Sequence, residues 1–261
     1  MRKIYKIIPF ILIVAIGILS IRLFVVFVPQ KAEKADTAEG VKYLHNLEAV
    51  GGNKADDIVR KAREKYEGAE RRKKIAQAIK EGNFEYAMKD VLIVGDSIMK
   101  AMYEYGIVDE SQILAEIGAG TAFLEDNIED IVAANPKVLV LHFGENQLST
   151  EEYAPEYAKQ YGELIQTLKK KLPNTKIYVD SIFPVEEKAY SAEPYTKNIA
   201  VYNQELEKMA KDIGVHYIDY DEMFASFDKN YFDADGIHPV ASFYSEQFLP
   251  YMLTEVGVAD E

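Results

Sequence analysis

The sequence predicts a three-layer α/β/α sandwich with a mostly parallel five-stranded sheet. From Val91 onward, short β-rich runs alternate with longer amphipathic stretches, which is the pattern of strands joined by helices in a parallel sheet. Runs such as VLIV and VLVLHF are apolar almost throughout, which indicates burial on both faces of the sheet. Ligand sites in such folds lie at the carboxyl ends of the strands, so any site is expected there.

Each element can be assigned in chain order. The predicted strands are Val91–Val94, Gln112–Ile117, Val138–Phe143, Lys176–Ile182 and Val215–Ile218. Between and after them, helices are predicted over Ile98–Tyr105, Ala122–Ala134, Tyr153–Leu172, Thr196–Ile213 and Ala241–Leu253. These elements define a main domain over residues 89–261.

Residues 1–30 are predicted to be a transmembrane anchor. The apolar segment Ile7–Val28 is interrupted by one charge, Arg22, and as a helix it would span about 33 Å, enough for a bilayer core of about 30 Å. The three basic residues before it predict a cytoplasmic N-terminus and an extracellular main domain, held at the cell membrane by a single pass. A cleaved signal peptide is the alternative, but its apolar region would be shorter, and no A-x-A site follows.

Residues 31–88 form a charged juxtamembrane segment. Lys54–Lys80 is predicted to be helical, with Gly82-Asn83 as the stop signal and Gly51-Gly52-Asn53 separating it from a shorter helical piece near Gly40–Val50. Its apolar positions make only a thin stripe. The segment is therefore interpreted either as a solvated helix packed loosely on the main domain or as a stalk or partner-binding helix.

The composition excludes several classes of function. With 43 acidic and 30 basic residues the net charge is −13, which disfavours nucleic acid as a partner. The absence of Cys excludes a disulfide, a thiolate nucleophile and a Cys-ligated metal. Catalysis must then use hydroxyl, carboxylate, amine or imidazole groups, and only four histidines are present: His45, His142, His216 and His238.

Polar residues follow two of the predicted strands directly. Gly95-Asp96-Ser97 places a hydroxyl at a strand-to-helix turn, although a Ser in that position is also a common helix N-cap. Asn146 follows the third predicted strand, where its amide can donate to an oxyanion or can bond its own loop. His142, within that strand, is interpreted as a core or supporting histidine.

The second predicted strand ends in the small residues Gly118-Ala119-Gly120-Thr121. Their backbone N–H groups can face a ligand or an oxyanion. The segment fails as a dinucleotide-binding fingerprint because Phe123 occupies the final glycine position. A plain tight turn is the alternative interpretation.

The last polar signal is the loop that contains Asp235 and His238. An imidazole at position 238 can take the proton of Ser97, while the carboxylate at position 235 orients the ring. The Asp-x-x-His spacing alone is weak. Four polar signals at the ends of different strands of one sheet make a shared catalytic site the better interpretation.

These residues resemble the SGNH (GDSL-type) hydrolase family over about residues 89–256. The resemblance rests on Gly95-Asp96-Ser97, the second-strand glycines, Gly144-Glu145-Asn146 and Asp235-Gly236-Ile237-His238. It implies a flavodoxin-like SGNH fold in which Ser97 is the nucleophile, His238 the general base and Asp235 the residue that orients it. The implied oxyanion hole is the Ser97 N–H, the N–H of Gly118 (or Gly120) and the Asn146 amide.

The chain departs from the family pattern at two places. The family usually has an acidic residue where this chain has Gln147. The glycines after the second predicted strand, Gly118 and Gly120, are two residues apart, whereas the family more usually has them three residues apart. Neither departure removes a catalytic group.

The expected function is therefore an extracytoplasmic serine esterase that acts on acyl esters, such as O-acetylated envelope glycans, without a cofactor or metal. The first alternative is an O-acyltransferase with the same triad, working beside a membrane-bound O-acyltransferase partner. The second is a non-catalytic envelope binding or scaffold module that keeps the fold.

Overall fold

The computed structural model describes residues 52–257, and the contacts divide the chain after Tyr66 into two units. The predicted anchor and the helical piece near residues 40–50 lie outside the described residues. Within residues 52–257, no helix is both long enough and apolar enough to cross a membrane. The anchor, the compartment and the domain boundaries therefore stay predictions.

A five-stranded sheet forms the centre of the second unit, and all its neighbouring strands are parallel. Its strands are β1 (Val91–Gly95), β2 (Ile113–Ala115), β3 (Val138–His142), β4 (Lys176–Asp180) and β5 (His216–Ile218), in the spatial order β2-β1-β3-β4-β5. Every residue of β1 and β3 is buried, as their apolar sequences predicted. The α/β fold and the parallel five-stranded sheet are confirmed.

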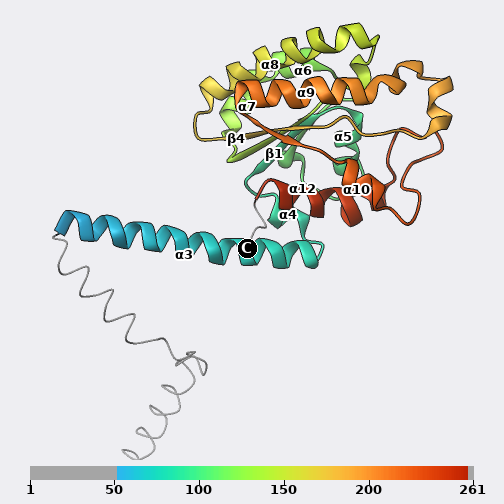
Figure 1. The fold of residues 1–261 in the computed structure, drawn as a ribbon. Helices are drawn as coiled ribbons and strands as arrows, with labels where there is room; N and C mark the ends of the chain where they lie inside the picture. Colours follow the sequence, from blue (N-terminus) through green and yellow to red (C-terminus); the bar gives the residue numbers. More distant parts are fainter. Residues whose placement is uncertain (1–51, 258–261) are drawn as a thin grey trace, which may run out of the picture. The chain divides into compact units, whose positions relative to one another are not determined.

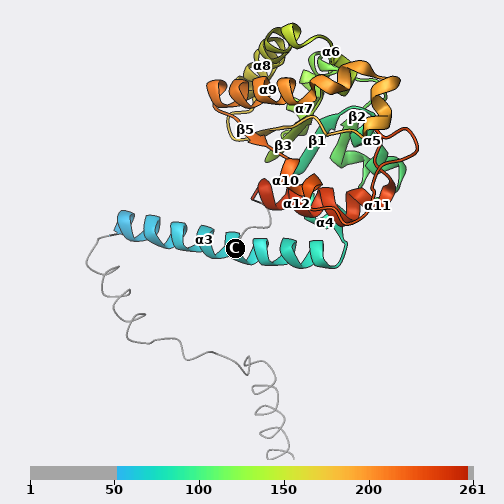
Figure 2. The same ribbon diagram turned by 45° about the vertical axis from the view of Figure 1, so that its right-hand side comes forward.

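Helices cover both faces of the sheet, so the structure has three layers (Figures 1 and 2). One face packs against α6 (Thr121–Asp126), α7 (Ile128–Ala134), α8 (Ala154–Lys171) and α9 (Ile199–Ile213). The other packs against α4 (Phe84–Ala87), α5 (Ser97–Glu104), α10 (Asp221–Ala225), α11 (Ala241–Phe243) and α12 (Leu249–Glu255). Each layer buries its own apolar cluster against the sheet.

Two predicted helices are interrupted. The helix predicted over residues 122–134 is two helices, α6 and α7, because Asn127 ends the first and precedes the second. The helix predicted over residues 241–253 contains a π-helical stretch, Tyr244–Phe248, between α11 and α12. A buried Tyr244 in that stretch donates to the carbonyl of Ile98, which ties the last helices to α5 (2.7 Å).

The helix α3 (Gly52–Lys80) confirms the helical prediction for residues 54–80, although it begins at Gly52, inside the predicted break. Near its end Ile75 and Ala78 are buried in the same apolar cluster as α4 and α5. The helix is followed by Gly82 in the left-handed region (φ +70°), as expected for a glycine after a helix end. This part of α3 therefore belongs to the core of the second unit.

Candidate active site

The nucleophile candidate lies at the turn between β1 and α5. The Asp96 carboxylate accepts a hydrogen bond from the Ile98 N–H (2.9 Å) and caps the helix that begins at Ser97. At Gly95 a Cβ would lie 2.8 Å from the His142 carbonyl, so this close approach of β1 and β3 requires glycine. The Ser97 N–H, at the first position of the helix, has no intrahelical partner and is free to donate to a ligand.

The loop before α11 brings an imidazole to this serine. The distance from Ser97 Oγ to His238 Nε2 is 3.1 Å, and that from His238 Nδ1 to Asp235 Oδ2 is 2.7 Å. The other oxygen of Asp235 accepts the N–H groups of Ile237 (2.8 Å) and His238 (3.0 Å). The structure therefore aligns the three side chains in the order that proton transfer requires.

Both members of the His238–Asp235 pair are accessible to solvent, with 48% and 46% of their side chains exposed. Partial burial opposes ionisation of Asp235, but the bonds from two backbone N–H groups and the imidazole outweigh it and lower the pKa of this carboxyl. Asp235 is thus a carboxylate that can orient the imidazole and stabilise its protonated form.

Asn146 lies between the β1–α5 turn and the segment that follows β2. Its side-chain N–H groups donate to the Ala119 carbonyl (3.0 Å) and to Asp96 Oδ2 (3.3 Å). The structure thus brings Asn146 to the β1–α5 turn and to residues 118–121, which we call the glycine segment. In that segment Gly118 has a left-handed backbone (φ +75°) and open space around it.

Gln147 holds the glycine segment in place. It accepts the Thr121 N–H (2.7 Å) and donates to Thr121 Oγ1 (3.0 Å), at the start of α6. A Cβ on Gly120 would lie 2.6 Å from the Gln147 side chain, so the two residues are in close contact. The residue that departs from the family pattern therefore has a definite structural contact here.

Beneath the exposed triad lies a buried charged cluster that the sequence did not predict, formed by Asp96, His142, Glu145 and Asp180. His142 Nε2 lies 3.0 Å from Glu145 Oε1, and its Nδ1 lies 3.4 Å from Asp180 Oδ2. The Asp180 side chain also accepts the Tyr220 hydroxyl (3.1 Å). The only signal in the sequence was a set of polar residues at the ends of apolar strands.

The environment of this cluster sets its charges. Burial, followed by the negative charge of Glu145, raises the pKa of Asp96 well above its ordinary value. Burial opposes the charged form of His142, but Glu145 and Asp180 outweigh it and raise the pKa of the imidazole. His142 in turn lowers the pKa of Glu145 against the effect of burial. These shifts favour an ionised His142–Glu145 pair and the neutral form of Asp96.

This protonation pattern explains a contact between two acids. A neutral Asp96 beside an ionised Glu145 avoids repulsion between two buried negative charges. Ligand atoms of Asp96, His142 and Glu145 lie within 4.8 Å of one another, the spacing of a candidate metal site. The His142–Glu145 contact and the two bonds that Asp96 accepts, from the Ile98 N–H and the Asn146 amide, already account for this arrangement.

A cavity of about 280 Å³ opens beside the triad. Ser97, Asn146 and His238 line it together with Glu145 of the buried cluster. Its other walls are Ile98, Leu148, Val185, Glu193, Tyr195, Thr196, Ile199 and Ile237. The reacting groups thus face a small space of mixed polarity, which accommodates a compact acyl group.

The family profile of the GDSL-like lipases/acylhydrolases matches residues 93–245, more than half of the chain. No protein of curated function matched the sequence. Among solved structures, a protein from Streptococcus pneumonia described as a platelet activating factor aligns with 19% identity and a TM-score of 0.50, over 77% of this chain and 98% of that chain. A protein from Parabacteroides merdae described as a GDSL-like lipase aligns with 18% identity and a TM-score of 0.50, over 65% of this chain and 95% of that chain.

The fold and the family match together define the class. The chain belongs to the GDSL-like lipase/acylhydrolase family, whose SGNH members share this parallel sheet. It is therefore an ester-bond hydrolase.

Proposed function

We propose that the protein is a membrane-anchored, extracytoplasmic serine esterase that removes O-acetyl or other short acyl groups from cell-envelope glycans. The observation that carries this proposal is the aligned chain of Ser97, His238 and Asp235 at the edge of a cavity of about 280 Å³. Its catalytic residues are these three, and its oxyanion hole is the Ser97 N–H, the Gly118 N–H and the Asn146 amide.

The geometry supports a two-step mechanism. Ser97 Oγ attacks the ester carbonyl while His238 Nε2 takes its proton, and the alkoxide leaves as the alcohol after receiving that proton from the imidazolium. Water then attacks the acyl-enzyme, again giving its proton to His238, and releases the carboxylic acid and the free serine. Asp235 orients the imidazole through Nδ1 in both steps.

Hydrolysis is favoured over transfer to a sugar hydroxyl by the exposure of the triad. About half of the His238 side chain is exposed, so water reaches the base that must activate it. Acyl transfer with the same triad would need a site that excludes water. A membrane-bound O-acyltransferase as partner belongs to that alternative and stays a prediction.

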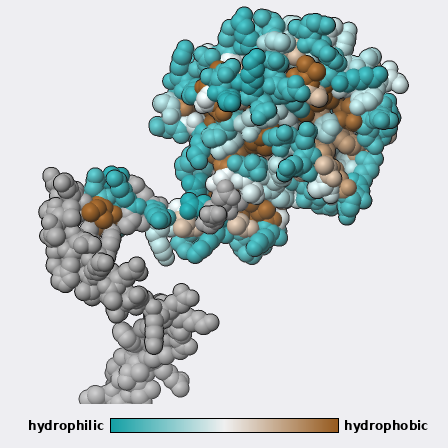
Figure 3. Space-filling model, in the orientation of Figure 1, coloured by the Kyte–Doolittle hydropathy of each residue, from teal (hydrophilic) through white to brown (hydrophobic). Residues whose placement is uncertain are grey.

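A glycan substrate is supported by the character of the surface. On the face drawn in Figure 3, hydrophilic residues dominate and apolar residues occur in smaller groups among them. The cavity beside Ser97 likewise includes Glu193 and Tyr195 with its apolar residues. A polar acyl ester fits such a site better than a long lipid chain.

The activity test is p-nitrophenyl acetate hydrolysis by the full chain in detergent. We expect hydrolysis that Ser97→Ala and His238→Ala abolish, with unchanged circular dichroism, and that Ser111→Ala, a serine outside the cavity, leaves intact. Activity that survives Ser97→Ala would contradict the serine mechanism. A folded but inert protein that transfers acetyl groups to added sugar acceptors would favour the transferase, and one that does neither would favour a binding module.

The location can be tested because the chain has no Cys, so one introduced cysteine is its only thiol. Lys170→Cys lies on an exposed position of α8, and Lys3→Cys lies before the predicted anchor. In intact cells, a membrane-impermeant maleimide should label position 170 and should label position 3 only after lysis. The reverse pattern, or protection of both, would overturn the proposed location.

A further inference from the structure

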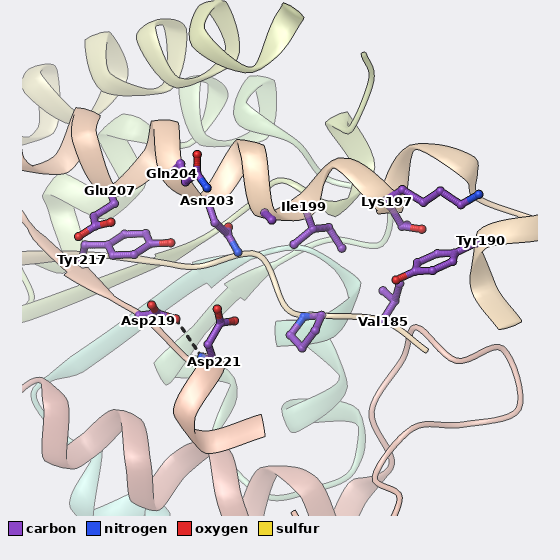
Figure 4. Close-up of a pocket in the computed structure, with 13 residues that line it drawn as sticks. Val185, Tyr190, Lys197, Ile199, Asn203, Gln204, Glu207, Tyr217, Asp219 and Asp221 are labelled. Carbon is purple, nitrogen blue, oxygen red and sulfur yellow. Dashed lines mark hydrogen bonds between the residues drawn. The ribbon is translucent and has the colours of Figure 1, made fainter. Parts of the chain in front are cut away.

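A second cavity, of about 320 Å³ (Figure 4), shares lining residues with the one beside the triad. Val185, Thr196 and Ile199 line both cavities. All three belong to the connection between β4 and α9 or to the start of α9. The two cavities therefore have a wall in common, and the volume of the second lies in the range of small-molecule sites.

The walls of the second cavity come from separate elements. Figure 4 shows Asn203 and Glu207 projecting from α9, with Tyr217 of β5 below them. Asp219, which follows β5, and Asp221, the first residue of α10, form the opposite wall, and Asp219 accepts the Asp221 N–H (2.9 Å). The lining is mainly polar.

Two polar groups of this cavity have no hydrogen-bond partner within residues 52–257. Neither the Tyr217 hydroxyl nor the Gln204 amide makes a hydrogen bond there. Burial and the nearby carboxylates of Asp219 and Glu207 raise the pKa of Tyr217, so its hydroxyl keeps its proton and can donate. By contrast, Asn203 is occupied, because it bonds the N–H and carbonyl of Ile182.

The charges of the lining restrict the ligand. Glu207, Asp219 and Asp221 are acidic, and the one cation of the lining, Lys197, lies with its Nζ 5.4 Å from the centre of the Tyr190 ring. Phosphate or carboxylate groups would be repelled by three acids. A neutral ligand with several hydroxyl groups satisfies the free donors and acceptors, and its apolar face can pack on a tyrosine ring.

We propose that this second cavity binds a neutral sugar unit of the glycan, next to the sugar whose acyl group is cleaved at Ser97. The assignment rests on the proposed esterase function and makes it more specific. It turns the site into two subsites, one for the acyl-bearing sugar and one for its neighbour.

The connection between β4 and α9 fixes the position of the two proposed subsites relative to each other. The Glu186 N–H donates to the Gly236 carbonyl (2.9 Å), and Lys188 Nζ donates to the Asp233 carbonyl (3.1 Å). The β4–α9 connection thus contacts the loop that carries His238 and also lines the second cavity. A bound sugar would therefore be positioned relative to the catalytic imidazole.

The test uses the full chain in detergent and oligosaccharides of one, two and three units that are partially O-acetylated, made separately from glucose, xylose and N-acetylglucosamine. We expect kcat/KM to rise about tenfold from one to two units in at least one series, as one or two added hydrogen bonds would give. Tyr217→Phe and Gln204→Ala should each reduce that gain about three- to tenfold through KM. Hydrolysis of p-nitrophenyl acetate, which has no sugar, should not change.

Two control variants match these changes. Gln166→Ala removes an exposed glutamine of α8, and Tyr86→Phe removes a tyrosine hydroxyl of α4, on the other face of the sheet. Neither should alter the gain with chain length. If no series shows a gain, or if it survives both cavity variants, the subsite assignment is wrong. If the unmodified chain does not hydrolyse p-nitrophenyl acetate either, the proposed function itself has failed.

Discussion

Two histidines of this domain are each paired with an aspartate, yet their surroundings are opposite. His238 and Asp235 lie on a loop, and about half of each side chain is exposed. His142 and Asp180 lie at the ends of two central strands, with 1% and 0% of their side chains exposed. The residue types are the same, so the difference in burial separates what the two pairs can do.

The exposed pair can exchange protons with a substrate or water, which a general base must do. The buried pair cannot reach the substrate. His142 instead lowers the pKa of Glu145, and the negative charge of Glu145 adds to the effect of burial in raising the pKa of Asp96. Glu145 and Asp96 directly precede Asn146 and Ser97 in the chain. We interpret the exposed pair as catalytic and the buried cluster as the support that positions the nucleophile and the oxyanion amide.

The sharpest test of this contrast replaces each histidine by alanine. His142→Ala removes the partner of two buried carboxyl groups and should lower the free energy of unfolding by about 3–5 kcal/mol. His238→Ala should change stability by less than about 0.5 kcal/mol, since it is exposed, while reducing kcat by about 10⁴-fold or more. Urea unfolding and steady-state kinetics measure the two effects.

The histidine comparison has a direct control in His216, an exposed residue of β5 that lies in neither pair. His216→Ala should preserve activity. Equal losses of stability in His142→Ala and His238→Ala would mean that burial does not distinguish the two pairs as we suggest.

Asn146→Ala tests the residue that connects the buried cluster, through Asp96, to the proposed oxyanion hole. The substitution removes an amide that donates to Asp96 and to Ala119 and that is the proposed oxyanion donor. We expect kcat to fall by about 10²–10³-fold with little change in KM, because the oxyanion forms only after binding. An unchanged kcat would remove Asn146 from the proposed oxyanion hole.

The two aspartates next to the catalytic groups should respond to pH in opposite directions. The pKa of Asp96 is raised in the fold, so its contribution to stability is complete below its unfolded pKa and is lost as pH rises through the raised value. The pKa of Asp235 is lowered, so its contribution is present above the unfolded pKa and is lost as pH falls through the lowered value.

Asp96→Asn and Asp235→Asn make this opposition measurable. Unfolding free energies between pH 3 and pH 8 should show that the cost of Asp96→Asn decreases as pH rises, while the smaller cost of Asp235→Asn increases. Parallel slopes for the two variants would contradict the assigned protonation of Asp96.

The smallest expected effect concerns Gln147. Gln147→Ala leaves the Thr121 N–H and hydroxyl without their partner, so the glycine segment should loosen and kcat should fall about three- to tenfold. Gln147→Glu keeps the acceptor for the N–H and should lose less. If both variants match the parent in kcat, Gln147 does not support the oxyanion hole.

Much of the fold was predictable because the strands are buried on both faces. Apolar runs such as residues 91–94 and 138–143 indicated β1 and β3 to within one residue. The break at Asn127 and the π-helical stretch from Tyr244 were missed, because both depend on contacts with the rest of the domain and not on local helix periodicity.

The proximity of Ser97, Asp235 and His238 was also predictable, since the carboxyl ends of parallel strands meet at one edge and the motifs are specific. Of the buried cluster, only His142 was interpreted as a core or supporting residue, and its burial confirms the core position. Its pairing with Asp180 was not predictable, because the two residues come from different strands and the sequence does not show which polar residues will meet in the core. The interaction of Gln147 with Thr121 equally required the folded loops.

The central claim is that Ser97 is the nucleophile and that the exposed histidine, not the buried one, activates it. Labelling with a fluorophosphonate, followed by peptide mass spectrometry, tests this directly. The account predicts one adduct, on Ser97, absent in Ser97→Ala, strongly slowed in His238→Ala and retained in folded His142→Gln. An adduct on another residue, or labelling of His238→Ala at the rate of the parent, would contradict it.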